Sequence, residues 1–268
     1  MNGQVLPLTA LDLSVAALLL LAAGGVSLAL QLGLERRLGI AAIRTVIQLL
    51  LIGYILKWVF DLDNAFVVLT IMVLMTIMAG RAAVQRPTRT FSGATWRAFA
   101  TLVLCGLTTT FVVTKAVVNI DPWYDPQYII PLLGMILGNG LTGISLCLDQ
   151  MLEQLTQKRP QIEMELAHGA TRWEAGRDVL RDSVRRGMIP IINSMMVVGI
   201  VSLPGMMTGQ ILAGVPPVVA VKYQIVVMFM IAAATSLGCI MIALLVFFRL
   251  FNAKHQLVAG VVRPQGKR

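Results

Sequence analysis

Residues 8–30 read LTALDLSVAALLLLAAGGVSLAL, an apolar run that contains a single charged residue. A helix needs about 20 predominantly apolar residues to cross the hydrocarbon core of a bilayer. The run is longer than the apolar core of a signal peptide, which has about 7–15 residues, and no Lys or Arg precedes it. We therefore expect a first transmembrane helix that remains in the mature protein.

Further apolar runs are spread along the rest of the chain. In lipid the backbone must satisfy its own hydrogen bonds, so each continuous run predicts a helix. The sequence thus predicts an all-α integral membrane protein, a polytopic bundle of about seven transmembrane helices. The spans after the first are expected near Leu38–Phe60, Ala65–Val84, Ala98–Val118, Gln127–Leu148, Met188–Ala213 and Val218–Phe248.

Composition and charge favour a membrane protein over a nucleic-acid-binding one. The 268 residues are 57% hydrophobic and 13% charged, whereas soluble domains carry about 25% charged residues. The net charge is +9. With the amino terminus outside, only Lys57, Lys115 and Lys222 fall on the outer side, and the other Lys and Arg face the cytoplasm. Because cytoplasmic loops carry such an excess, we expect a multi-pass protein of the inner (plasma) membrane with a cytoplasmic carboxyl terminus.

The chain is expected to form one permease domain over residues 1–254, followed by a basic cytoplasmic tail over residues 255–268 that is disordered. One uncharged stretch, Gly187–Val221, is too long for one straight span and too short for two. Pro204 and Gly205 interrupt it, and a proline inside a helix removes a hydrogen bond. We expect a broken or re-entrant element around Ser202–Gly209, which a membrane tolerates only where it is buried in protein or lines a cavity.

The longest loop, residues 149–187, faces the cytoplasm in this topology and carries apolar residues at helical spacing. In it, Glu163 stands six residues before the pair Gly169-Ala170, an arrangement that resembles the coupling loop of bacterial ABC importers. There the glycine ends one helix and lets a short cross helix dock on the ATPase, and glycine suits such a turn because it tolerates positive φ. Glu163 is expected to cap a helix start or to pair with a basic residue of the ATPase. An amphipathic helix on the surface of anionic lipid is the other interpretation. The candidate coupling residues are Glu163, Glu165, Gly169, Ala170 and Thr171.

Several signatures are absent from the sequence. No phosphate-binding motif GxxxxGK[ST] occurs. If ATP drives the protein, a partner ATPase must bind the ATP and Mg, and we expect no cofactor on this chain. No triad, metal cluster or pair of carboxylates suggests an enzyme. Cys105, Cys147 and Cys239 each lie inside an apolar run and are interpreted as small core side chains.

A resemblance to a known family rests on several segments of the sequence. They are Val201-Ser-Leu-Pro-Gly-Met-Met-Thr-Gly-Gln-Ile-Leu-Ala-Gly214, Lys222-Tyr-Gln-Ile225, Gly53-Tyr-Ile-Leu-Lys57, Pro131-Leu-Leu-Gly-Met-Ile-Leu-Gly-Asn139 and the coupling segment. From about Arg44 to Val258 the chain resembles the FetB-type permeases, the membrane subunits of a bacterial ABC exporter linked to iron, to which plant aluminium-tolerance permeases also belong. The resemblance implies a separate ATPase partner and a complex of two permeases and two ATPases. It implies the substrate less firmly, because iron is linked to bacterial members and UDP-glucose to plant members.

The candidate residues for the translocation pathway are polar or conformationally special residues within the spans. A pair of thioethers, Met206 and Met207, could bind a soft metal ion, whereas iron prefers oxygen and nitrogen donors. Packing is the alternative role for the methionines, and interhelical hydrogen bonding is the alternative for the polar residues. Arg44 could also snorkel to the inner membrane surface. The pathway candidates are Arg44, Gln48, Asn139, Asn193, Ser202, Pro204, Gly205, Met206, Met207 and Thr208.

The sequence therefore favours a permease that exports a metal ion, iron first, with a separate ATPase and a second copy of itself in the bilayer. The same architecture could move a nucleotide sugar or an organic solute. A secondary transporter that needs no ATPase is the alternative of a different class.

Overall fold

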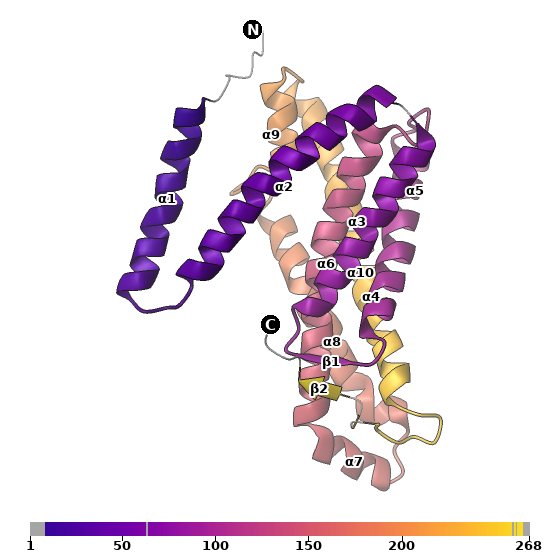
Figure 1. Ribbon diagram of the computed structural model, residues 1–268. Coiled ribbons are helices and arrows are strands. Elements are labelled where there is room, and N and C mark those ends of the chain that lie inside the picture. The colour runs from indigo at the N-terminus through magenta and orange to yellow at the C-terminus, as the bar shows by residue number, and fades with distance from the viewer. Residues whose placement is uncertain (1–8, 63, 259, 261, 265–268) are drawn as a thin grey trace. The chain divides into compact units, whose positions relative to one another are not determined.

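The computed structural model describes residues 9–62, 64–258, 260 and 262–264, and most of them are helical (Figure 1). Among these residues, six helices are long and apolar enough to cross a membrane. The prediction of an all-α membrane protein is confirmed, while the count of seven spans and their orientation stay predictions. The six candidate spans are Leu11–Ala29, Glu35–Leu62, Ala65–Gln85, Ala94–Val117, Pro126–Gln157 and Pro217–Leu250.

The chain divides into two compact units, of which the first contains Met1–Asn64 and Gly209–Pro216. In this unit α1 spans Ala10–Ala29 and α2 spans Glu35–Leu62. Thr9 starts α1 with a capping box, because its N–H donates to the Asp12 carboxylate at 2.8 Å and its hydroxyl accepts from the Asp12 N–H. The start expected at Leu8 lies outside the described residues.

Ser27 closes the turn between α1 and α2. Its hydroxyl donates to Glu35 Oε2 at 3.0 Å and accepts from the Leu34 N–H at 3.2 Å. Both helices leave large apolar side chains exposed, such as Leu19 and Tyr54. Such a surface is suited to lipid or to another protein subunit rather than to water.

The second unit contains Ala65–Thr208 and Pro217–Arg268. Figure 1 shows its long helices running side by side, with α6 packed against α3, α8 and α10. The long helices of this unit are α3 (Ala65–Gln85), α6 (Pro126–Gln157), α8 (Arg172–Val197) and α10 (Pro217–Leu250).

The remaining span of this unit is a continuous helix with two π-helical segments. It consists of α4 (Ala94–Leu102), η1 (Val103–Leu107), α5 (Thr108–Val112) and η2 (Val113–Val117). A threonine hydroxyl group hydrogen-bonds to the backbone of the first π-helical segment, because Thr110 Oγ1 donates to the Gly106 carbonyl at 2.7 Å. A π-helical segment inside an α-helix frequently marks a functional position.

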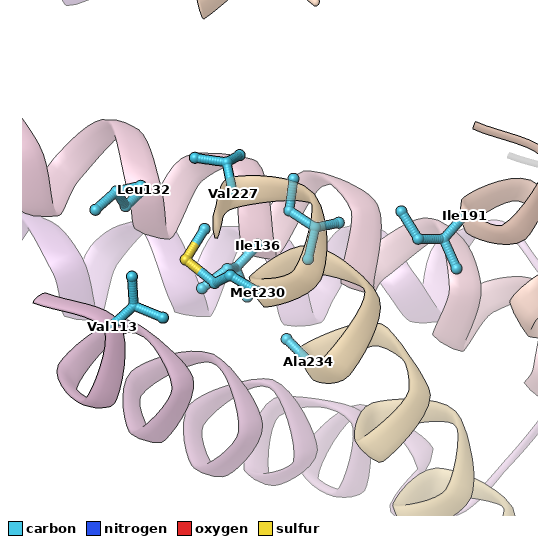
Figure 2. Close-up of a cluster of buried hydrophobic side chains, with 8 residues drawn as sticks. Val113, Leu132, Ile136, Ile191, Val227, Met230 and Ala234 are labelled. Atoms are coloured by element: carbon cyan, nitrogen blue, oxygen red, sulfur yellow. The ribbon is translucent and has the colours of Figure 1, made fainter. Parts of the chain in front are cut away.

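A hydrophobic cluster joins α6, α8 and α10 of the second unit (Figure 2). Leu132 and Ile136 come from α6, Val227 and Met230 from α10, and Ile191 from α8. Each is at least nine-tenths buried. Burying such a side chain contributes about 1.5–3 kcal/mol, so this cluster fixes the packing of α6, α8 and α10.

The helices α6 and α8 cross in an antiparallel direction. Gly143 of α6 lies against Gly187 of α8, while Ile136, earlier in α6, shares the hydrophobic cluster with Ile191, later in α8. The absence of side chains at the two glycines lets the backbones meet.

The expected loop over residues 149–187 is largely a continuation of the helices that flank it. Helix α6 extends to Gln157, α7 spans Arg159–Ala167, and α8 begins at Arg172. Helix α8 passes Gly187 without interruption, so the expected span boundary at Met188 is not a helix boundary.

The span expected over Met188–Ala213 is broken, as predicted, but the break covers residues 198–204 and so overlaps the expected Ser202–Gly209 only at its start. Helix α8 ends at Val197, and α9 spans Gly205–Leu212. Gly199 adopts φ +85° in the break, a conformation that glycine permits. Pro204 precedes α9 rather than interrupting it, so Gly205–Gly209 are helical.

The carboxyl-terminal tail is not disordered in its described part. Strand β2 (Val262–Pro264) pairs antiparallel with β1 (Arg89–Phe91), and Thr90 lies opposite Arg263. This pairing attaches residues 262–264 to the connection between α3 and α4. Residues 259, 261 and 265–268 of the expected tail lie outside the described residues.

Candidate functional site

The coupling candidates lie at the turn between α7 and α8. The Gly169 N–H donates to the Leu166 carbonyl at 3.1 Å, and the Ala170 N–H donates to the Glu165 carbonyl at 3.1 Å. Gly169 adopts φ +93°, which is the left-handed conformation that ends many helices. It therefore stands at a turn between two helices, where the sequence predicted it.

Thr171 starts α8 with a capping box. Glu174 Oε2 accepts from both the N–H and the hydroxyl of Thr171 at 2.7 Å, and the Thr171 hydroxyl accepts from the Glu174 N–H. These bonds to the carboxylate lower the pKa of Glu174, with a smaller effect from His255. The capping box fixes the direction in which α8 leaves the turn.

The two glutamates of α7 make local contacts. Glu163 Oε1 accepts from Arg159 Nε at 2.7 Å, and Glu165 Oε1 accepts from Gln161 Nε2 at 3.5 Å. Glu163 lies in the middle of α7, so the expectation that it caps a helix start is wrong. Exposed pairs of this kind contribute about 0.3–0.5 kcal/mol, which leaves Glu163 able to exchange partners.

The carboxyl-terminal loop, residues 252–258, binds the start of α8, a contact that the sequence did not reveal. The Arg172 N–H donates to His255 Nδ1 at 2.9 Å. Asn252 shapes the loop, because its Oδ1 accepts from the N–H groups of Lys254 and Gln256 at 3.0 and 2.9 Å. No local sequence signal could show this contact, since His255 is 83 residues away from its partner.

A cavity of about 540 Å³ separates α7 from this loop. Glu163 and Leu166 line it from α7, and Lys254, His255 and Leu257 line it from the loop. Of the coupling candidates, Glu163 therefore faces a cavity whose other wall is the carboxyl-terminal loop.

The first turns of α8 are held against α10 by aromatic contacts. The Trp173 and Phe247 rings meet edge to face with centroids 5.5 Å apart. Gly176 is packed so tightly that an added Cβ would lie 2.5 Å from Phe247 Cε2 and 3.1 Å from Phe251 Cε2. The first turns of α8 and the end of α10 are therefore tightly packed together.

Asn139 and Asn193 lie on the same side of the α6–α8 crossing. Asn139 precedes Gly143 by one turn of α6, and Asn193 follows Gly187 in the antiparallel α8. Both side chains are exposed, and Asn139 Nδ2 donates to the Met135 carbonyl at 2.9 Å. Exposed amides in a membrane helix favour a polar neighbour over lipid.

The predicted residues around the break are brought together only in part. Ser202 is exposed in the non-helical segment, and Thr208 Oγ1 donates to the Pro204 carbonyl at 3.1 Å in the first turn of α9. Met206 packs against the hydrophobic cluster, which favours packing over metal binding for its thioether. Met207 is half-buried.

Arg44 and Gln48 belong to the first unit, where both are exposed one turn apart on α2. The described residues include no group of three His, Cys, Asp or Glu side chains placed to hold a metal ion. Cys105, Cys147 and Cys239 are buried and free, as expected of core side chains.

These features define the class of the protein as a polytopic α-helical membrane protein. Residues 10–251 match the model of the family described as "Uncharacterised protein family (UPF0014)", so the chain belongs to the UPF0014 family. The probable iron export permease protein FetB of Escherichia coli (strain K12) is 34% identical over 255 residues, covering 95% of this chain and 96% of its own length.

Relatives in other organisms extend this similarity. The UPF0014 membrane protein YjkA of Bacillus subtilis (strain 168) is 33% identical over 92% of this chain and 97% of its own length. The protein ALUMINUM SENSITIVE 3 of Arabidopsis thaliana is 29% identical over 97% of this chain and 92% of its own length. No solved structure matches the chain.

Proposed function

We propose that the protein is the membrane-spanning permease subunit of an ABC-type transporter and that a separate subunit binds ATP and Mg. The observation that carries the proposal is the turn at Gly169, where the short helix α7 meets the long helix α8. A short exposed helix joined to a long one by a single fixed turn suits the transmission of motion from an ATPase into the membrane.

The transported substrate is a metal ion, and iron is the first candidate. Support comes from the E. coli relative, whose name describes a probable iron export permease. Within this chain the amide and hydroxyl groups of Asn139, Asn193, Ser202 and Thr208 offer the oxygen and nitrogen donors that iron accepts. The exposed amides also support a second copy of the permease around a shared pathway, in a complex with two ATPases.

The protein is placed in the inner (plasma) membrane with its amino terminus outside. The distribution of Lys and Arg supports this orientation, in which the α7–α8 turn faces the cytoplasmic ATPase. The residues Glu163, Glu165, Gly169, Ala170 and Thr171 then form the contact with the ATPase.

The proposal is tested by co-expressing the full chain with each stand-alone ABC ATPase subunit of the same organism. Assembly is measured by co-purification, and transport by ATP-dependent accumulation of Fe²⁺ in inside-out vesicles. Gly169→Val forces a β-branched residue to φ +93°, a strain of about 1–3 kcal/mol. We expect weaker assembly or ATP hydrolysis without transport, and the same from Glu163→Arg.

Gly214→Val is the matched control, because Gly214 also adopts φ +93° and, like Gly169, has no atom within 4 Å of an added Cβ. It should retain assembly with the ATPase. If Gly169→Val and Glu163→Arg both keep full assembly and transport, the coupling role is refuted. Transport of UDP-glucose instead of Fe²⁺ would change the substrate, and transport driven by an ion gradient without any ATPase would refute the ABC mechanism.

A further inference from the structure

An apolar groove of about 580 Å³ lies between α10 and the span that contains η1. Leu104 and Cys105 line it from η1, and Ile240, Leu244 and Phe248 line it from α10. Both walls belong to candidate membrane spans. Hydrocarbon, rather than water, is therefore the solvent available to fill the groove.

The π-helical segment η1 shapes one wall of this groove. Gly106, within this segment, is buried against α6, where an added Cβ would lie 3.5 Å from Leu137 Cδ2. Leu104, two residues earlier, remains 56% exposed and lines the groove. The segment thus packs one side of the helix tightly while leaving the other side open. The volume of the groove lies within the usual range of about 300–1,000 Å³ for small-molecule sites.

Positive charge lies at one end of the groove, the end that Phe248 lines. The Arg172 guanidinium carbon stands 5.3 Å from the centroid of the Phe248 ring, and Nη1 donates to the Asn252 carbonyl at 3.4 Å. Arg249 follows Phe248 and is exposed. In the described part of the chain, neither arginine forms an ion pair with a carboxylate. A ligand that is apolar along its length and anionic at one end complements this arrangement.

We infer that the groove binds an acidic phospholipid, with an acyl chain between η1 and α10 and the phosphate beside Arg172 and Arg249. Basic pockets between membrane helices bind anionic headgroups, and each Arg near such a surface contributes about 1 kcal/mol. The contact does not depend on the proposed transport function. Because Arg172 is also the first residue of α8, bound lipid would restrain the helix that leaves the α7–α8 turn.

The test uses the full-length protein in detergent, titrated with phosphatidylglycerol or phosphatidylcholine. Retained lipid is counted by native mass spectrometry and stabilisation is followed as a shift in Tm. We expect phosphatidylglycerol to be retained preferentially. Ile240→Trp fills the groove and should abolish that retention. Ile225→Trp is the control, because Ile225 lies on the same helix, outside the groove, and is 48% exposed against 44% for Ile240.

The charged end is tested separately with Arg172→Gln and Arg249→Gln. Each should reduce the preference for phosphatidylglycerol about fivefold, the ratio that corresponds to about 1 kcal/mol. Unchanged lipid retention by Ile240→Trp would refute the site. A loss of dimer mass without a loss of lipid in that variant would assign the groove to a second copy of the chain instead. Equal retention of both lipids by the wild-type protein would refute recognition of the headgroup.

Discussion

Gly143 of α6 and Gly187 of α8 are in direct backbone contact. A Cβ atom on Gly187 would lie 2.7 Å from the Gly143 carbonyl oxygen, and a Cβ atom on Gly143 would lie 3.0 Å from the Gly187 carbonyl oxygen. Cys239 of α10 packs against the same point, with Sγ 2.7 Å from the position of a Gly187 Cβ. Three helices of the second unit therefore meet where two of them have no side chain.

Replacing Gly187 with alanine should separate these helices. The added methyl group meets backbone on one side and Cys239 on the other, so neither neighbour can move away at low cost. Overpacking of this kind costs about 1–3 kcal/mol, and we expect a lower Tm for Gly187→Ala in detergent. Gly138→Ala is the control, because an added Cβ there meets no atom within 4 Å. Equal Tm values for the two variants would contradict the close contact.

Removing the ring of His255 should release the first turn of α8. The Arg172 N–H then loses its acceptor, so its hydrogen exchange should accelerate in His255→Ala. Lys254→Ala, in the same loop, should leave the exchange of Arg172 unchanged. Lys254 contributes its backbone N–H to the loop's hydrogen bonds, and the substitution retains that group. Exchange at the wild-type rate in His255→Ala would show that the bond does not protect this amide.

Acidification should weaken the capping box at the start of α8. The pKa of Glu174 in the folded protein is lowered from its ordinary value of 4.5, mainly by the Thr171 N–H and hydroxyl. A lowered pKa stabilises the fold above the ordinary value, and that contribution disappears as the pH falls through the folded pKa. The Tm difference between wild type and Glu174→Ala should therefore shrink below about pH 4.5. A pH-independent difference for Glu174→Ala would contradict the prediction.

Cysteines at Asn193 and Ser202 test the pathway assignment. Both positions are exposed, whereas the native cysteines are buried. Asn193→Cys and Ser202→Cys should react with a charged, membrane-impermeant thiol reagent at rates that change when ATP is added to the assembled transporter. Phe229→Cys, exposed in an apolar part of α10, should remain unreactive because lipid covers it. Inert cysteines at both pathway positions would indicate that lipid or protein covers this face.

Hydropathy predicted most spans from the sequence because a membrane selects long apolar runs. The expected Ala65–Val84 differs from α3 by one residue at its end. Hydropathy could not show that α8 continues through Gly187. The first half of α8 is polar and its second half is apolar, although the backbone is helical in both halves. Pro204 correctly indicated a break, but a proline is also tolerated at the start of a helix, and the break extends back to Val198.

Contacts between distant parts of the chain were missed. The polar composition of the tail predicted disorder, yet Thr90 pairs with Arg263 and Arg172 binds His255. Such pairs leave no periodic signal in either segment. Gly169 was placed correctly because a helix-ending glycine is a local feature, whereas the local partner of Glu163 was not identified.

The proposed seven-span topology divides one crossing of the membrane between α8 and α9, and this division has a consequence for biosynthesis. The part of α8 after Gly187 rises only about 15 Å at 1.5 Å per residue, half of a hydrocarbon core about 30 Å thick. Neither α8 nor α9 is long and apolar enough to be a candidate span, whereas α10 is. A translocon that admits segments by their hydrophobicity would not retain α8 or α9 alone. Their entry into the bilayer should therefore wait until α10 leaves the ribosome, so that the three helices insert as a group.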